Sequence, residues 1–104
     1  MPHLHKMLSI YLEMNYKSWF VYVVRCKDNS LYTGITTDIS RRVKEHNTSK
    51  KGAKYTRSRR PVRLVHEMKV LNRSEALKLE YKFKQLKKAE KEAIISGKHI
   101  VVYN

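Results

Sequence analysis

Five side chains in this sequence have the chemistry to act on a phosphate group, and they lie on separate segments. They are Tyr22, Tyr32, Arg42, His46 and Glu80. A guanidinium can bind phosphate oxygens with two parallel hydrogen bonds, and a histidine can exchange a proton near neutral pH. A carboxylate can hold Mg²⁺ while water and substrate phosphate fill the other positions. Whether the set forms a site depends on the elements that position it.

The segment from Asp38 to His46 has helical spacing, which separates two adjacent arginines. At about 100° per residue, Arg42 and His46 fall on the same side as Val43, whereas Arg41 points away. An arginine on the apolar side must snorkel, pair with an acid or await an anionic ligand, because an unpaired buried charge is too costly. For His46, a structural role and a role in proton transfer both stay open.

Helical spacing also leaves two interpretations of Glu80. A helix through this region places it in the apolar sector between Ala76 and Phe83. It could form an i,i+4 pair with Lys84 that contributes only about 0.2–0.5 kcal/mol. It could instead be a metal ligand, because Mg²⁺ is held by one or two carboxylates with water and phosphate.

The two tyrosines lie on two predicted strands at 19–26 and 31–35, joined by a polar turn. If Lys27 paired with Ser30, Tyr22 and Tyr32 would point to opposite faces. A loop with an odd number of residues, or a bulge, would bring them to one face. A shared tyrosine site requires the second arrangement; otherwise both are ordinary strand aromatics.

The remaining pattern predicts strand, strand, helix, strand and helix in that order. Thr36, Thr37 and Asp38 offer N-cap side chains for the first helix, and Asn72 with Glu75 approximates a capping box for the second. The predicted elements after the hairpin are a helix at 38–46, a strand at 62–70, a helical region that reaches Ile95 with or without a break, and a C′ stop at Gly97.

The charge of the chain predicts a polyanionic partner. Its 23 Lys and Arg against 9 Asp and Glu give a net charge of +14, so nucleic acid is the first expectation and an anionic membrane surface the second. A loop from 47 to 61 concentrates cations without an acid. Its predicted nucleic-acid-binding residues are Lys50, Lys51, Lys54, Tyr55, Arg57, Arg59 and Arg60, where Tyr55 either stacks on a base or caps the core.

Length and composition limit the architecture to one small domain. The 104 residues are 41% hydrophobic, and Cys26 is the single cysteine, so neither an internal disulfide nor a cysteine-rich zinc site is expected. We expect a poorly ordered extension at 1–18, a domain at 19–95 and a tail at 96–104 that is β-like or disordered. With no apolar run of about 18 residues and no signal-peptide pattern, a cytosolic protein is expected.

Taken together, these motifs resemble the GIY-YIG nuclease superfamily over roughly 19–95. Val21-Tyr22-Val23 occupies the place of the first motif and Tyr32-Thr33-Gly34 that of the second. Arg42 lies ten residues after Tyr32, as does the family's helix arginine, and Glu80 matches its metal-binding glutamate. The chain looks most like the short stand-alone bacterial members and the N-terminal domain of the excision-repair endonuclease. The implied fold is α+β, a small three-stranded antiparallel sheet flanked by helices.

The resemblance implies an endonuclease that acts on DNA with one divalent cation, Mg²⁺ or Mn²⁺, held by Glu80. Tyr22 or Tyr32 would deprotonate or orient the attacking water, Arg42 would offset charge on the phosphate, and His46 would assist proton transfer. The alternative is a non-catalytic module on the same fold that binds DNA or structured RNA.

Three departures from the family pattern accompany the resemblance. Tyr22 lacks the flanking Gly-Ile, Ile35 stands where the excision-repair domain has a lysine, and Glu92 stands where that enzyme has an asparagine.

Overall fold

The fold is a three-stranded antiparallel sheet in the order β2-β1-β3, with helices on both faces. The computed structural model describes residues 4–8, 10 and 17–97. Most of the N-terminal extension, predicted to be poorly ordered, and the tail at 99–103, predicted to be β-like or disordered, lie outside the described residues. The elements are β1 (Trp19–Arg25), β2 (Leu31–Thr36), α2 (Ile39–Thr48), α3 (Lys54–Arg57), β3 (Arg63–Val70), α4 (Arg73–Gln85) and α5 (Lys88–Ile95).

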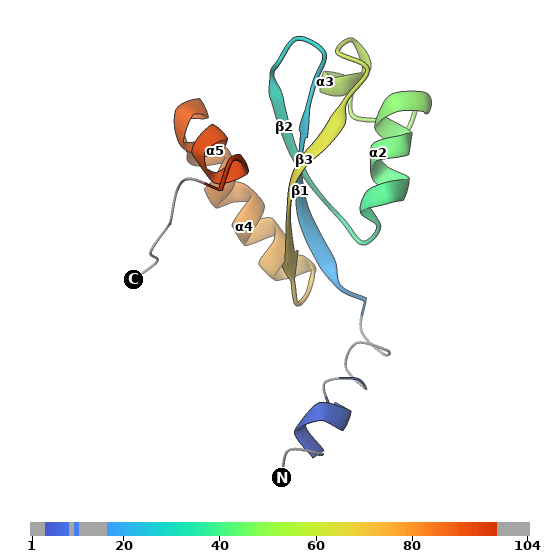
Figure 1. Cartoon of the computed structure of the whole chain (residues 1–104). Helices are drawn as coiled ribbons and strands as arrows, with labels where there is room; N and C mark the ends of the chain where they lie inside the picture. The colour runs from blue at the N-terminus through green and yellow to red at the C-terminus, as the bar shows by residue number, and fades with distance from the viewer. Residues whose placement is uncertain (1–3, 9, 11–16, 98–104) are drawn as a thin grey trace.

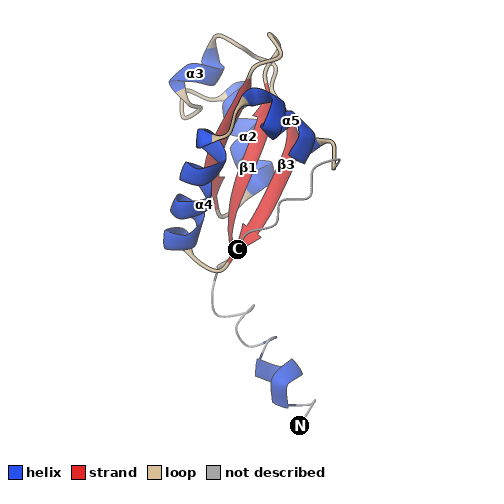
Figure 2. Cartoon of the chain, turned by 90° about the vertical axis from the view of Figure 1, so that its left-hand side faces the viewer, coloured by secondary structure: helices blue, strands red, loops and turns tan. Residues whose placement is uncertain are grey.

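The sheet separates two helical layers. Figure 1 shows α2 on one side of the sheet and α4 with α5 on the other, and Figure 2 looks onto the α4 side. Alternate residues of the central strand face the two layers, so Val21, Tyr22, Val23 and Val24 are all buried. The predicted α+β fold is confirmed.

The α2 side of the sheet carries a compact apolar cluster. Tyr22, Val24, Cys26 and Val62 form its buried part. Partly buried side chains of β2 and α2 pack against it, namely Tyr32, Ile39 and Val43. Cys26, which directly follows β1, is a free, buried thiol that fills space in this cluster, as predicted, although the predicted strand extended one residue too far.

The hairpin between β1 and β2 has an odd loop. The Cys26 N–H donates to the Ser30 carbonyl and the Asn29 N–H donates to the Cys26 carbonyl, both at 2.9 Å, which leaves residues 27–29 as the turn. Asn29 takes a left-handed conformation with φ 70°, typical of three-residue hairpins. Tyr22 consequently pairs with Gly34 and Val24 with Tyr32, so both tyrosines lie on one face.

The helix boundaries follow their predicted caps. The Asp38 carboxylate accepts from the Arg41 N–H at 3.1 Å, and the Asn72 side chain accepts from the Glu75 N–H at 2.9 Å. The second helical region breaks at Leu86 and Lys87, and Gly97 follows α5 with φ 72°. The basic loop contains one further helical turn, α3.

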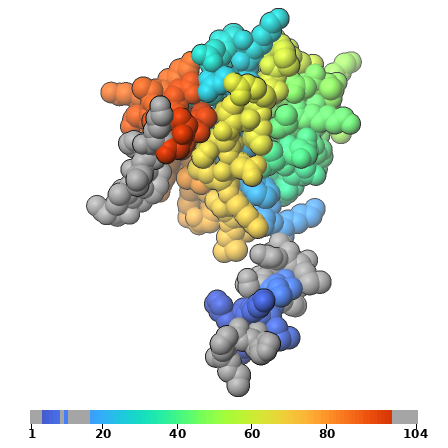
Figure 3. All heavy atoms as spheres, in the orientation of Figure 1, coloured from blue at the N-terminus to red at the C-terminus, as the bar shows by residue number. Residues whose placement is uncertain are grey.

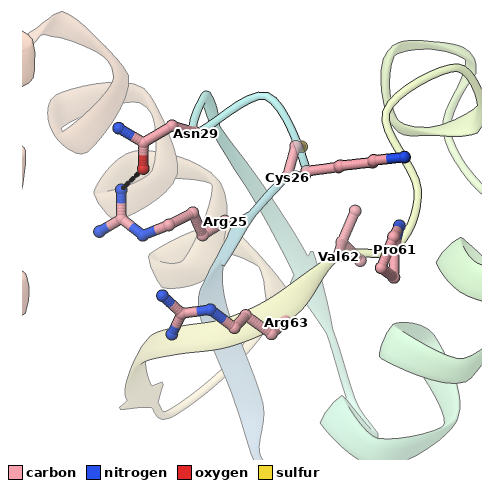
Figure 4. A pocket seen from close by; sticks show the side chains of 7 residues that line it. Arg25, Cys26, Asn29, Pro61, Val62 and Arg63 are labelled. Carbon is pink, nitrogen blue, oxygen red and sulfur yellow. Dashed lines mark hydrogen bonds between the residues drawn. The ribbon is translucent and has the colours of Figure 1, made fainter.

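A bidentate ion pair joins the end of β1 to α5. Arg25 donates to both Glu92 oxygens, at 2.8 and 2.6 Å, and to the Asn29 side chain at 3.0 Å. Arg25 also lines a hollow of about 310 Å³ with Pro61, Val62 and Arg63 among its walls (Figure 4). Glu92 therefore positions α5 against the hairpin.

The two edge strands differ in their surroundings. Figure 3 shows β3 reaching the surface between the α2 layer and the α4 and α5 layer, and most of its side chains are exposed or partly exposed. The opposite edge belongs to β2, which contacts α4 more extensively than β3 does. Over the described parts of the chain, no helix combines the length and apolar character that crossing a bilayer requires.

Glu92→Gln should weaken the attachment of α5 to the hairpin. We expect the free energy of unfolding to fall by about 1 kcal/mol, a modest value because the pair is partly exposed. Urea unfolding measures this change. Lys78→Gln is the matched control, because its pair with Glu75 is exposed on both sides and should contribute less than about 0.5 kcal/mol. Equal losses in the two variants would show that the bidentate pair has no special role.

Candidate active site

The centre of the site is a hydrogen bond between Tyr22 and His46, which lie on β1 and α2. The Tyr22 hydroxyl is 2.7 Å from Nε2 of His46, and both side chains are almost fully buried. To reach this position the Tyr22 ring crosses β2 at Gly34. A Cβ atom on Gly34 would lie 2.5 Å from the hydroxyl oxygen. The ring of Tyr22 on β1 thus requires a glycine at position 34 of β2, the glycine of the Tyr-x-Gly motif.

The second ring nitrogen of His46 fixes the direction of that hydrogen bond. Nδ1 is 2.8 Å from Oγ1 of Thr56, and this hydroxyl donates to the Ala53 carbonyl at 2.9 Å. The competing contact, from the Ala53 N–H to Nδ1, is 3.4 Å long and weak. Because Thr56 has one proton to donate, the shorter distances favour a hydrogen on Nδ1. Nε2 is then bare and accepts the Tyr22 O–H.

Burial keeps His46 neutral. Burial, the largest cause, and the positive charges of Arg42 and Arg60 together lower the pKa of His46 from 6.5 to about 4, against the opposing effect of Glu45. Tyr22 is shifted the other way. Burial raises its pKa to about 12, while nearby Arg42 opposes the shift. At neutral pH the pair is therefore a phenol that donates to an uncharged imidazole.

Tyr32 completes an aromatic group on the same face. Its ring centroid lies 5.2 Å from that of His46 and 6.5 Å from that of Tyr22. Tyr55 of α3 stacks on Tyr32 with centroids 6.0 Å apart. Tyr55 thus caps the aromatic group, one of its two predicted roles, although 40% of its surface is exposed. Burial raises the pKa of Tyr32.

Arg42 borders this group from α2, on the inward side that the helical spacing predicts. Its Nη1 donates to Glu45 at 3.1 Å and to the Lys51 carbonyl at 2.8 Å. A hydrogen bond between Arg42 and Tyr22 also acts on the pKa values of both side chains, which places the guanidinium beside the Tyr22 hydroxyl. Glu45 orients the guanidinium, and its i,i+3 spacing was the signal that could have identified it.

Glu80 reaches the same edge from α4, on the opposite face of the sheet. Its side chain is 19% exposed and lies 3.7 Å from Nζ of Lys84. Its charge also raises the pKa values of Tyr22 and Tyr32, as a carboxylate near both phenols would. Glu80 therefore forms the predicted lysine pair, and its charge acts on both tyrosines.

The single carboxylate of Glu80 suits a cation that keeps most of its water ligands. The described residues contain no group of three or more His, Cys, Asp and Glu side chains arranged to hold a metal. One carboxylate is sufficient for Mg²⁺ or Mn²⁺ when water and substrate phosphate supply the other ligands. The residues present fit that mode of binding.

The predicted nucleic-acid-binding residues divide into two groups. Arg60 is turned inward, where it donates to the carbonyls of His46 and Ser49 and closes the end of α2. Arg59 pairs with Asp28 at 3.1 Å and covers the Tyr55 ring at 3.9 Å. The residues exposed to solvent are Lys50, Lys51, Lys54, Tyr55 and Arg57. Sequence spacing offered no signal for the internal role of Arg60.

Comparison with known proteins identifies the family of this chain. The family model described as the GIY-YIG catalytic domain matches residues 18–93. The chain belongs to the GIY-YIG family. A UPF0213 protein of Desulfotalea psychrophila is 55% identical over 82% of this chain and 77% of its own length, and one of Halobacterium salinarum is 54% identical over 71% and 95%. GIY-YIG proteins are a nuclease family that generally depends on divalent metals.

Solved structures of related proteins have the same fold. The solution structure of a UPF0213 protein from Bacillus halodurans is 48% identical, covers 78% of this chain and 85% of its own, and has a TM-score of 0.50. A protein from E. faecalis is 42% identical, with coverages of 86% and 98% and a TM-score of 0.53. The chain thus resembles short members of the GIY-YIG family.

Gly34→Ala should displace the Tyr22 ring. The added Cβ overlaps the phenol, so we expect a loss of about 1–3 kcal/mol in the free energy of unfolding. A double-mutant cycle with Tyr22→Leu, whose side chain does not reach Gly34, isolates this contact. The alanine should cost much less in the leucine background. The same cost in both backgrounds would mean that the ring does not require the glycine.

Acid should destabilise the fold through His46. Between pH 6.5 and about 4 the unfolded chain binds a proton that the buried ring excludes, so stability falls with decreasing pH, by at most about 1.4 kcal/mol per unit. Urea unfolding between about pH 7 and 5 measures the slope. Asp28 and Glu92, whose pKa values are lowered, lose their contributions only at lower pH. The His46→Gln variant should be less stable overall, but its free energy of unfolding should change less with pH over this range. A slope equal to that of the unmodified protein would contradict the assignment of the pH dependence to His46.

Proposed function

We propose that this protein is a divalent-metal-dependent endonuclease that hydrolyses phosphodiester bonds in DNA. The observation that carries the proposal is the 2.7 Å hydrogen bond between Tyr22 and a buried, neutral His46. A phenol that donates a hydrogen bond to a neutral imidazole can pass its proton to that ring. A tyrosine with only a packing role does not require such a partner. Family membership supports nuclease chemistry, and the proposed catalytic residues are Tyr22, Tyr32, Arg42, His46 and Glu80.

Tyr22 and His46 would act as a proton relay. With a pKa of about 12, Tyr22 is protonated at neutral pH and is not itself a strong base. As its oxygen takes a proton from the attacking water, its own proton passes to Nε2 of His46. The resulting imidazolium lies beside the arriving phosphate, whose negative charge favours it. Tyr32, on the same face, would orient the water.

Arg42 and Glu80 would stabilise the negative charge of the phosphate from opposite faces of the sheet, Arg42 directly and Glu80 through a bound cation. The guanidinium of Arg42 would bind phosphate oxygens, for which its planar set of N–H donors is suited. Glu80 would hold Mg²⁺ or Mn²⁺, and such a cation, when bound, polarises the phosphate and stabilises the leaving oxygen. The exposed cations of the basic loop would bind the flanking backbone of the DNA.

The basic surface by itself also fits the second candidate, a module that binds DNA or RNA without cleaving it. The net charge of +14 predicts affinity in both cases and does not distinguish them. The arrangement of Tyr22 and His46 favours the enzyme. We place the activity in the domain at 19–95, with no catalytic residue assigned to 1–18 or 96–104.

Glu80→Gln should abolish metal-dependent cleavage, because only the charge that holds the cation is removed. Plasmid, branched and single-stranded DNA are incubated with Mg²⁺ or Mn²⁺, and rates should fall at least about 100-fold while DNA affinity in chelator is retained. Glu75→Gln is the matched control, a carboxylate on the same helix whose pair with Lys78 is exposed. Arg42→Lys should also lose rate, because an ammonium lacks the bidentate geometry.

Three outcomes separate the possibilities. Equal cleavage by the Glu80→Gln variant and the unmodified protein would reveal a contaminating nuclease. Binding without cleavage of any substrate would favour the non-catalytic module. Loss of cleavage in the Glu75→Gln control would show that the helix, rather than the Glu80 carboxylate, is the sensitive element.

A further inference from the structure

A hollow of about 260 Å³ lies beside the tyrosines at the edge of β2. It is lined by Leu31, Tyr32, Thr33, Tyr55, Lys84 and Lys91. Tyr32 belongs to the aromatic group described above, so the hollow adjoins the proposed catalytic residues. Its two charged lining residues are both lysines, which makes it a site for an anion with aromatic and aliphatic walls.

The two lysines are held loosely. Nζ of Lys84 is 3.7 Å from the Glu80 carboxylate, and its side chain is 48% exposed. Lys91 lies 6.0 Å from the centre of the Phe83 ring. By contrast, Arg25 in the hollow of Figure 4 is already bound to Glu92 at 2.6 Å. The lysines can therefore turn toward a ligand at little cost, whereas Arg25 cannot.

We propose that this hollow binds the phosphate of a nucleotide adjacent to the scissile bond, through Lys84 and Lys91. The sugar or base of that nucleotide would lie against Leu31 and the exposed part of Tyr55. The proposal rests on the proposed function, because it places a phosphodiester chain across the edge of β2. It adds two binding residues from α4 and α5 to the cations of the basic loop.

Lys84 gives the hollow a second property. In the free protein its ammonium partly neutralises Glu80, the proposed metal ligand. When Lys84 turns to the phosphate, Glu80 recovers its full charge and binds a divalent cation more tightly. By thermodynamic linkage, a cation on Glu80 releases Lys84 and strengthens phosphate binding by the same factor. Lys84 thus couples the binding of DNA to the binding of metal.

The phosphate site is tested by the salt dependence of DNA binding in chelator, where no cleavage occurs. A fluorescein-labelled oligodeoxynucleotide, in single-stranded and duplex form, is the probe. Lys84→Met and Lys91→Met should each reduce the log-log salt slope by about 0.7–0.9. Lys78→Met is the matched control, a lysine of α4 paired with Glu75 away from the hollow, and should leave the slope unchanged. Unchanged slopes in both hollow variants would overturn the phosphate site.

The coupling is tested by Mn²⁺ binding, followed by electron paramagnetic resonance. Without DNA, Lys84→Met should bind Mn²⁺ several-fold more tightly than the unmodified protein. Addition of the oligonucleotide should strengthen Mn²⁺ binding in the unmodified protein but less in Lys84→Met. Lys91→Met should leave the affinity of free protein for Mn²⁺ unchanged, because Lys91 is not paired with Glu80. Equal Mn²⁺ affinity in Lys84→Met and the unmodified protein would overturn the coupling.

Failure of the proposed function would look different. If the unmodified protein and Glu80→Gln bind Mn²⁺ equally, Glu80 is not a metal ligand, and both the catalytic assignment and the coupling are wrong. The phosphate site would still be decided by the salt slopes, which require neither metal nor cleavage.

Discussion

The passage of the Tyr22 ring across Gly34 is the constraint on which the site depends. It carries a hydroxyl from the central strand to the sheet edge, where His46 accepts its hydrogen bond at 2.7 Å. Any larger residue at Gly34 would close that path. The odd loop of the hairpin is equally necessary, because a one-residue change of register would turn Tyr32 to the other face.

An edge strand explains how so small a domain assembles a site from both sides. Arg42 and His46 belong to α2 on one side of the sheet, and Glu80 belongs to α4 on the other. A central strand would keep these two layers apart. Tyr22 and His46 are also shielded from solvent by their burial. Burial raises the pKa of Tyr22 and lowers that of His46, so both groups are neutral near pH 7.

The excess of positive charge serves two purposes. Arg25 and Arg60 are used internally, to attach α5 and to close α2. Lysines of the basic loop and of the hollow beside Tyr32 remain exposed or weakly paired, and these make the surface positively charged. Lys84 shares features of both groups, because it is exposed and is also weakly paired with Glu80, the proposed metal ligand.

Local patterns in the sequence determined the order of strands and helices, the caps at Asp38 and Asn72 and the inward side of α2, because each depends on neighbours a few residues apart. They also set the condition that a shared tyrosine site needs an odd loop. Tertiary structure alone decided that Thr56 holds His46, that Arg60 closes α2 and that the charge of Glu80 acts on both tyrosines. The contacts of Thr56 and Arg60 join residues 10 to 14 positions apart, and Glu80 lies 58 positions from Tyr22 in the sequence, so no helical or strand periodicity encodes them.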